Sequence, residues 1–140
     1  TVYGPWGRPD MSYFKFLILN KKKKNIEIYN FGKHQRSFTY IDDLVSNMFK
    51  ILSFYKKTKK RGDSSVFNLG NEKTIKLMDF LKVLEKVTKI KFKKKFVRKQ
   101  MGDVEKTEAN LNIEKKKFNL KFDYDLKTGL NKFYDWFKSY

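Results

Sequence analysis

The stretch IEIYNFGKHQRSFTYIDD, residues 26–43, decides the fold class. Its first residues, IEIYN, alternate apolar and polar side chains as a half-buried strand does, and FGKHQ carries the glycine and polar residues of a turn. RSFTYI predicts a second short strand, after which Asp42 or Asp43 fits the N-cap of a helix. Strand, turn, strand and helix in such close succession favour an α/β fold.

The rest of the chain continues this alternation. Residues 1–5 are expected to be the last part of a sheet strand entering a loop, and residues 11–20 predict a helix capped by Asp10. No internal repeat or change of composition divides residues 1–140, so one domain is expected. Next come a predicted helix with Leu44, Met48, Leu52 and Tyr55 on one face, a polar loop over 56–65, and a strand over 66–70 that Gly70 stops. A second predicted helix has Leu77, Met78, Leu81, Leu84 and Thr88 on one face and is followed by a strand over 90–97. The final predicted helix has Leu126, Leu130, Phe133, Phe137 and Tyr140 on one face.

The net charge of +18 raises the possibility of a basic nucleic-acid-binding module. Its composition argues against one, because only four of the 33 basic residues are arginine, the side chain that reads grooves and clamps phosphates. The lysines come in runs at predicted loops, strand edges and helix ends. Lysine on a solvated surface, in a chain also rich in Phe, Tyr, Ile and Asn, is typical of AT-rich coding DNA and needs no partner.

Several classes of site and location are disfavoured. The chain has no cysteine and one histidine, which makes a conventional metal site unexpected. No window approaches the ~18 consecutive apolar residues of a membrane span, and no leader resembles a signal peptide, so a cytoplasmic protein is expected. The seven glycines form no glycine-rich turn that could cradle the phosphates of a dinucleotide.

Four stretches in register carry a family resemblance: TVYGPWGRPDM (1–11), IYNFGKHQRSFTYIDD (28–43), VFNLGN (66–71) and QMGDVEKTEAN (100–110). Together they resemble the C-terminal half of extended short-chain dehydrogenases/reductases of the NAD-dependent epimerase/dehydratase family, and are most similar to its UDP-glucuronate 4-epimerase group. The resemblance implies the substrate-binding part of a Rossmann-type α/β enzyme. The N-terminal dinucleotide-binding half, which holds the glycine-rich loop, most of the NAD site and the catalytic Tyr-x-x-x-Lys helix, is expected to be missing here.

The same resemblance implies roles for individual residues. Thr1 would contact the hexose and Val2 the nicotinamide of NAD, while Arg8 would meet the sugar carboxylate, which a guanidinium fork matches with two hydrogen bonds. Tyr29 and Asn30 mark the segment whose backbone would face the uracil. The remaining implied contacts are Arg36 to the UDP diphosphate, Asn68 near the nucleotide, and Asp103 to the ribose hydroxyls.

The sequence departs from the family pattern near these residues. Ser37 stands where an acidic residue usually follows the arginine, which puts the orientation of Arg36 in question, and Met101 replaces a proline that would fix a turn. Asn110 replaces an aspartate and could act as a helix cap, and His34 is expected to be a solvated turn residue.

Catalysis by this chain alone is not expected. Tyr-x-x-x-Lys spacings occur at Tyr29/Lys33, Tyr55/Lys59 and Tyr134/Lys138, but none matches the family's catalytic position. The sequence therefore predicts the UDP-sugar-binding half of a nucleotide-sugar epimerase, acting by transient oxidation at C4, with homodimers formed by intact family members. A non-catalytic remnant, a fragment of another nucleotide-sugar dehydratase or epimerase, and a nucleic-acid-binding module remain alternatives.

Overall fold

A computed structural model of the protein describes residues 1–58 and 64–140. Part of the predicted polar loop over 56–65 lies outside the described residues, and residues 56–58 belong to the preceding helix. The elements follow in the order β1 (Val2–Tyr3), α1 (Ser12–Lys21), β2 (Ile26–Ile28), the 3₁₀ turn η1 (Tyr29–Gly32), β3 (Gln35–Ser37), β4 (Thr39–Tyr40), α2 (Ile41–Thr58), β5 (Thr74–Lys76), α3 (Leu77–Thr88), β6 (Lys94–Phe96), β7 (Lys106–Thr107), α4 (Asn112–Phe118) and α5 (Leu126–Lys138). This is the α/β class that the sequence predicts.

The described strands pair in three small sheets. β1 runs parallel to β4, with Val2 opposite Thr39, and β2 runs parallel to β6, with Ile26 opposite Lys94. β3 lies between antiparallel β5 and parallel β7. Because Arg36 of β3 lies opposite Thr107 of β7, the loop that precedes β7 passes beside β3.

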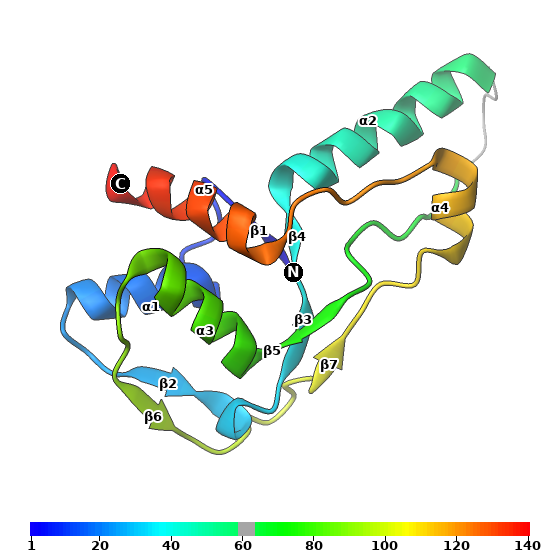
Figure 1. Ribbon diagram of the computed structural model, residues 1–140. Coiled ribbons are helices and arrows are strands. Elements are labelled where there is room, and N and C mark those ends of the chain that lie inside the picture. The colour runs from blue at the N-terminus through cyan, green and yellow to red at the C-terminus, as the bar shows by residue number, and fades with distance from the viewer. Residues whose placement is uncertain (59–63) are drawn as a thin grey trace.

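Aromatic side chains form much of the core between the strands and three helices. Figure 1 shows α1, α3 and α5 grouped together, with β2 and β6 along one side of the group. Phe38, between β3 and β4, stacks on Phe80 of α3 with ring centroids 4.7 Å apart. Phe133 of α5 meets Tyr13 of α1 edge to face at 4.7 Å. The predicted apolar faces of α3 and α5 supply this core, since Leu81, Leu84, Leu130, Phe133 and Phe137 are all buried.

The predicted helix caps are wrong in two places. Met11 occupies the N-cap of α1, because the Asp10 carboxylate accepts hydrogen bonds from the Arg8 guanidinium instead. α2 begins at Ile41, directly after β4, so Asp42 and Asp43 lie inside its first turn. Asp43 is buried there and accepts hydrogen bonds from the backbone N–H groups of residues 123 and 124, which ties α2 to the segment before α5.

α2 is helical as its spacing predicts, but its apolar face is not covered. Val45, Met48, Phe49 and Leu52 are between 40% and 64% exposed. Figure 1 shows α2 running outward from the end of β4, with α4 near its far end. There Phe54 packs edge to face on Phe118 at 5.2 Å. Helical periodicity identifies which side chains share a face, while the neighbouring element decides whether that face is buried.

The strand predicted over residues 66–70 does not form. Val66 is 97% exposed, and no described strand pairs with this segment. Side chains satisfy its backbone instead: the N–H of Asn68 donates to Glu114, and that of Asn71 donates to the Thr39 hydroxyl. A strand needs a neighbouring backbone as well as apolar residues, and here the neighbour is missing from the described residues. The strand predicted over 90–97 shortens to β6.

Three short elements were not predicted: β5, β7 and α4. β5 and β7 consist of three and two residues and owe their extended conformation to pairing with β3. Asn110 does not take the cap position expected of it, because Leu111 is the N-cap of α4; the Asn110 side chain accepts a hydrogen bond from the N–H of Asn112 one residue further on. Among the described residues, no helix combines the length and apolar character that crossing a membrane requires.

Candidate functional site

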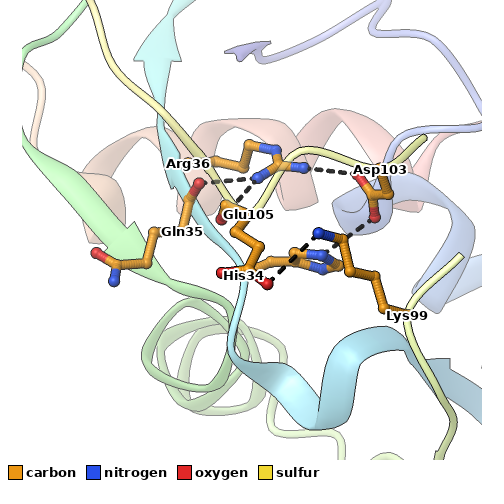
Figure 2. Close-up of polar contacts among 6 residues, drawn as sticks. All are labelled: His34, Gln35, Arg36, Lys99, Asp103 and Glu105. Atoms are coloured by element: carbon orange, nitrogen blue, oxygen red, sulfur yellow. Dashed lines mark hydrogen bonds and ion pairs between the residues drawn. The ribbon is translucent and has the colours of Figure 1, made fainter. Parts of the chain in front are cut away.

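Arg36 and Asp103 meet at the centre of the candidate site, although they lie 67 positions apart in the sequence. Nη2 of Arg36 donates to Oδ1 of Asp103 at 2.9 Å, and Nη1 donates to the backbone oxygens of Gln35 at 2.9 Å and Glu105 at 3.2 Å. Figure 2 shows the guanidinium held between these groups. Since both side chains of the ion pair are only partly exposed, the arginine is fixed in orientation before any ligand arrives.

The pairing of β3 with β7 explains this encounter. The N–H of Gln35 donates to the backbone oxygen of Glu105 at 2.8 Å, so the loop carrying Asp103 is tied to the strand carrying Arg36. Lys99, in the same loop, lies 3.4 Å from the carboxylate of Glu105. Met101, at the position where the resemblance implies a proline, is fully exposed and lies next to Gly102 in this loop.

His34 is a buried member of the site and not the solvated turn residue that we expected. Its side chain is 7% exposed, and its Nε2 lies 3.3 Å from Oδ2 of Asp103 without hydrogen-bond geometry. The backbone oxygen of His34 accepts from the N–H of Leu77, which brings the start of α3 over the turn. The polar sequence of the turn gives no indication that the start of α3 buries His34. One signal was present: His34 and Arg36 are two residues apart and so share one face of an extended segment.

Tyr29 lines a pocket beside this site, and Asn30 follows it in the turn η1. Asn30 and Phe31 both adopt left-handed backbone conformations, with φ of 49° and 50°, and Gly32 follows with φ of 79°. Left-handed non-glycine residues cost of the order of 1 kcal/mol each and gather at functional turns. The Nδ2 of Asn30 is buried and has no hydrogen-bond partner in the described part of the chain. The Tyr29 hydroxyl donates to Glu27 at 2.7 Å, and this hydrogen bond raises the pKa of Tyr29.

Two pockets lie on either side of His34. One, of about 200 Å³, is lined by Tyr29, His34 and Asp103 together with residues of α1. The other, of about 150 Å³, is lined by His34, Arg36 and apolar side chains of β5 and α3. Three of the predicted site residues are thus brought together with His34 in one region: Tyr29, Arg36 and Asp103.

Val2 and Arg8 line a separate pocket of about 390 Å³ in the first turn of the chain. Trp6, 84% exposed, also lines it and lies against Trp136 of α5 with ring centroids 5.4 Å apart. Arg8 uses Nε and Nη2 to donate to both carboxylate oxygens of Asp10, at 3.1 and 2.6 Å. The hydrogen bond from Arg8 lowers the pKa of Asp10. Asp10 also lines the pocket beside Tyr29, so the two regions adjoin at this carboxylate.

Asn68 stands apart from the Arg36 cluster, whereas Thr1 lies beside it, because the amino group of Thr1 donates to the backbone oxygen of Ser37 at 2.7 Å. The backbone oxygen of Thr1 accepts from the N–H of Thr39, which places Thr1 at the β1–β4 pair. The Asn68 amide donates to the backbone oxygen of Asn110 at 3.2 Å. Within the described residues, the hydrogen bonds of Asn68 lead toward α4 and none reaches Arg36 or Asp103. No group of three or more His, Cys, Asp or Glu side chains gathers for a metal ion among the residues described.

Comparison with known proteins identifies the family. The model of the NAD dependent epimerase/dehydratase family matches residues 1–70, half of the chain. The chain belongs to this family. Its fold agrees with that of family structures: the crystal structure of UDP-glucuronic acid 4-epimerase from Bacillus cereus in complex with UDP-glucuronic acid and NAD superposes with a TM-score of 0.86 and 29% identity, over 99% of this chain and 43% of that one.

Two curated relatives match nearly the whole chain. UDP-glucuronate 4-epimerase 4 of Arabidopsis thaliana is 42% identical over 151 residues, covering all of this chain and 35% of the relative. Uncharacterized protein MJ1055 of Methanocaldococcus jannaschii is 44% identical over 98% of this chain and 40% of its own length. The chain thus spans well under half the length of these relatives, and it matches the C-terminal part of the Rossmann-type epimerase fold.

Proposed function

We propose that this chain is the UDP-sugar-binding portion of an NAD-dependent nucleotide-sugar 4-epimerase whose substrate is UDP-glucuronate. The observation that carries the proposal is the Arg36–Asp103 pair, which offers a pre-oriented guanidinium beside a carboxylate. A guanidinium suits a diphosphate, and a carboxylate accepts hydrogen bonds from the vicinal hydroxyls of a ribose. The names of the family's UDP-glucuronate 4-epimerases support the choice of nucleotide and sugar.

The other predicted residues take roles around this pair. The left-handed turn at Tyr29 and Asn30 would receive the uracil, and Asn68 would lie near the nucleotide. Thr1 would contact the hexose. Arg8 would bind the glucuronate carboxylate, for which the Asp10 carboxylate is already a structural stand-in, since it engages the same guanidinium through two oxygens. Binding would therefore exchange one carboxylate for another on an exposed guanidinium, at little electrostatic cost.

NAD would remain a cofactor of the whole enzyme, accepting hydride from C4 of the sugar and returning it to the other face. Within this chain only Val2, on β1, is proposed to touch it. The part of the sequence seen here encodes no glycine-rich phosphate turn, so we assign most of the NAD site and the catalytic Tyr-x-x-x-Lys to a nucleotide-binding portion. We accordingly propose that residues 1–140 alone do not turn over substrate, and that the assembled enzyme is a cytoplasmic homodimer.

Two unpartnered features support docking of such a nucleotide-binding portion on this chain. The apolar face of α2, formed by Val45, Met48, Phe49 and Leu52, is exposed, and no strand within residues 1–58 and 64–140 pairs with residues 66–70. The longer relatives contain the additional chain that such surfaces would need. Burying the α2 face would contribute roughly 25 cal/mol per Å² of apolar surface removed from water.

Binding measurements test the nucleotide-sugar proposal. Arg36→Lys removes the planar fork while keeping the charge, and we expect UDP-glucuronate affinity, measured by isothermal titration calorimetry, to fall by roughly tenfold or more. Arg98→Lys is the matched control, because Arg98 is an exposed arginine outside the cluster. Equal effects of the two substitutions, or equal affinity for ADP-glucose, would contradict the proposal.

Reading the coding DNA directly upstream of Thr1 tests the assignment of the other half. An in-frame segment encoding Gly-x-x-Gly-x-x-Gly and a Tyr-x-x-x-Lys helix is expected, and the extended chain should then epimerise UDP-glucuronate at C4. Unrelated upstream sequence would favour the non-catalytic remnant.

The docking of a nucleotide-binding portion on α2 is tested by Phe49→Asp. This substitution should lower the melting temperature of the extended chain, where Phe49 would be buried, but not that of residues 1–140 alone. Ser46→Asp, on the flank of the same helix, is the control.

A further inference from the structure

His34 is the one histidine of the sequence, and its place in the site has no counterpart in the roles assigned above. Its side chain is 93% buried, since 7% of it is exposed, and it lines both of the pockets that flank the Arg36–Asp103 pair. Ser12 of α1 and Leu77 of α3 close the same two pockets. A buried imidazole at this position is unusual, because burying a polar side chain costs free energy unless it finds a partner.

The two oxygens of Asp103 divide between two side chains. Oδ1 accepts from Nη2 of Arg36 at 2.9 Å, while Oδ2 faces Nε2 of His34 at 3.3 Å. Figure 2 shows the imidazole and the guanidinium on the two sides of this carboxylate. Nε2 of His34 has no hydrogen-bond partner among the described residues. The imidazole thus lies where a proton on Nε2 would complete a second contact to the carboxylate.

Other charged groups surround the imidazole less closely. The larger pocket beside the imidazole is lined by Lys15 of α1, Glu27 of β2 and Asp10. The Tyr29 hydroxyl donates a hydrogen bond to Glu27 there. Arg36 faces the imidazole across Asp103. Histidine is the side chain whose charge ordinarily changes between about pH 5 and 8.

We propose that His34 is a positioning residue that makes UDP-sugar binding depend on its own protonation, an inference that rests on the proposed nucleotide-sugar function. Protonated His34 donates through Nε2–H to Oδ2 of Asp103, which weakens the hold of that carboxylate on Arg36 through Oδ1 and leaves the guanidinium more available to the diphosphate. It also adds one positive charge beside a doubly negative ligand. Neutral His34 leaves Asp103 to compete with the diphosphate for the guanidinium.

Affinity should therefore rise as the pH falls through the titration of His34. By thermodynamic linkage, the ligand must raise the midpoint of that titration by the logarithm of the factor by which protonation strengthens binding. We expect UDP-glucose to bind roughly three- to tenfold more tightly at about pH 5.5 than at about pH 8. UDP-glucose is the right probe, because its diphosphate diester keeps its charge over this range, whereas UDP itself would titrate.

The test combines calorimetry with NMR. UDP-glucose affinity is measured across the pH range, and the imidazole Cε1–H signal of His34, unambiguous in a chain with one histidine, is followed with and without UDP-glucose. His34→Gln should abolish the pH dependence of affinity. The control Lys33→Gln removes an exposed neighbouring charge and should leave the pH dependence intact.

The outcomes separate the two proposals. UDP-glucose binding that does not vary with pH, or that varies equally in His34→Gln, overturns the role of His34 and leaves the nucleotide-sugar function standing. Failure to bind UDP-glucose at any pH overturns both. If His34→Gln does not fold, the NMR titration of the unsubstituted chain decides alone: a midpoint that UDP-glucose does not raise overturns the inference.

Discussion

At the scale of single residues, Gly129 lies at a close contact between α5 and β1. A Cβ at this position of α5 would overlap the ring and hydroxyl of Tyr3 on β1. Glycine in a helix is ordinarily a weakness, and replacing it with alanine favours the helix by about 1 kcal/mol. Here the opposite sign is expected: Gly129→Ala should lower the free energy of unfolding by about 1–3 kcal/mol through overpacking. Urea denaturation checks this, with exposed Asn131→Ala on the same helix as the control; a stabilised Gly129→Ala would contradict the packing.

Asp43 provides a second prediction at this scale. Its buried carboxylate is the acceptor for the N–H groups of Asp123 and Tyr124, at 3.0 and 3.1 Å. Asp43→Ala leaves two donors without a partner, and we expect it to cost about 2–4 kcal/mol of unfolding free energy. Asp42→Ala is the matched control, because Asp42 lies in the same first turn but is exposed. Similar losses from both substitutions in thermal unfolding would show that only helix-terminal charge matters.

At the scale of elements, α3 is tied to β6 through Glu85. Burial favours the neutral acid, but hydrogen bonds from the Lys94 ammonium and the N–H of Phe92 outweigh it and lower the pKa of Glu85 from its ordinary value. A lowered folded-state pKa stabilises the fold above the unfolded pKa and loses that contribution as the pH falls through the folded value. Glu85→Gln should therefore destabilise by about 1 kcal/mol at neutral pH and lose this effect in acid. Urea unfolding at neutral and at acid pH tests this prediction. The control is Asp79→Asn, which removes the exposed ion pair between Asp79 and Lys82 on the same helix and should change the free energy of unfolding little.

The elements that sequence alone predicted well are the ones whose own periodicity specifies them. α3 and α5 follow their apolar faces closely, because each face is long and is buried against the other helices. Residues 66–70 show the limit: an apolar stretch predicts a strand, but only a neighbouring backbone forms one. β7 and the burial of His34 depend in the same way on contacts far away in the sequence. Of the site, the family resemblance singled out Arg36 and Asp103 for separate contacts with a nucleotide sugar, but it did not predict their ion pair, and no local pattern connects the two residues.

At the scale of the whole molecule, the core is rich in aromatic side chains and the surface is rich in lysine. The buried set consists largely of Phe, Tyr, Leu and Ile side chains, whereas most lysines are exposed. Because the buried rings are not available to stack on bases, any binding of DNA should be electrostatic. We expect its affinity to fall at least about a hundredfold between roughly 50 and 200 mM salt, while UDP-glucuronate binding changes far less. Fluorescence anisotropy of labelled duplexes measures the former; salt-resistant, sequence-specific binding would support the nucleic-acid alternative.

The contact between Trp6 and Trp136 gives the molecule a built-in optical reporter. The sequence contains two tryptophans, and the pair joins the turn that carries Arg8 to the terminal helix. All indole emission thus originates at one spot, at the edge of the pocket assigned to the sugar. A ligand that draws Arg8 away from Asp10 would shift the turn and alter the quenching between the rings. Intrinsic fluorescence can therefore follow occupancy of the sugar pocket in real time without any attached dye.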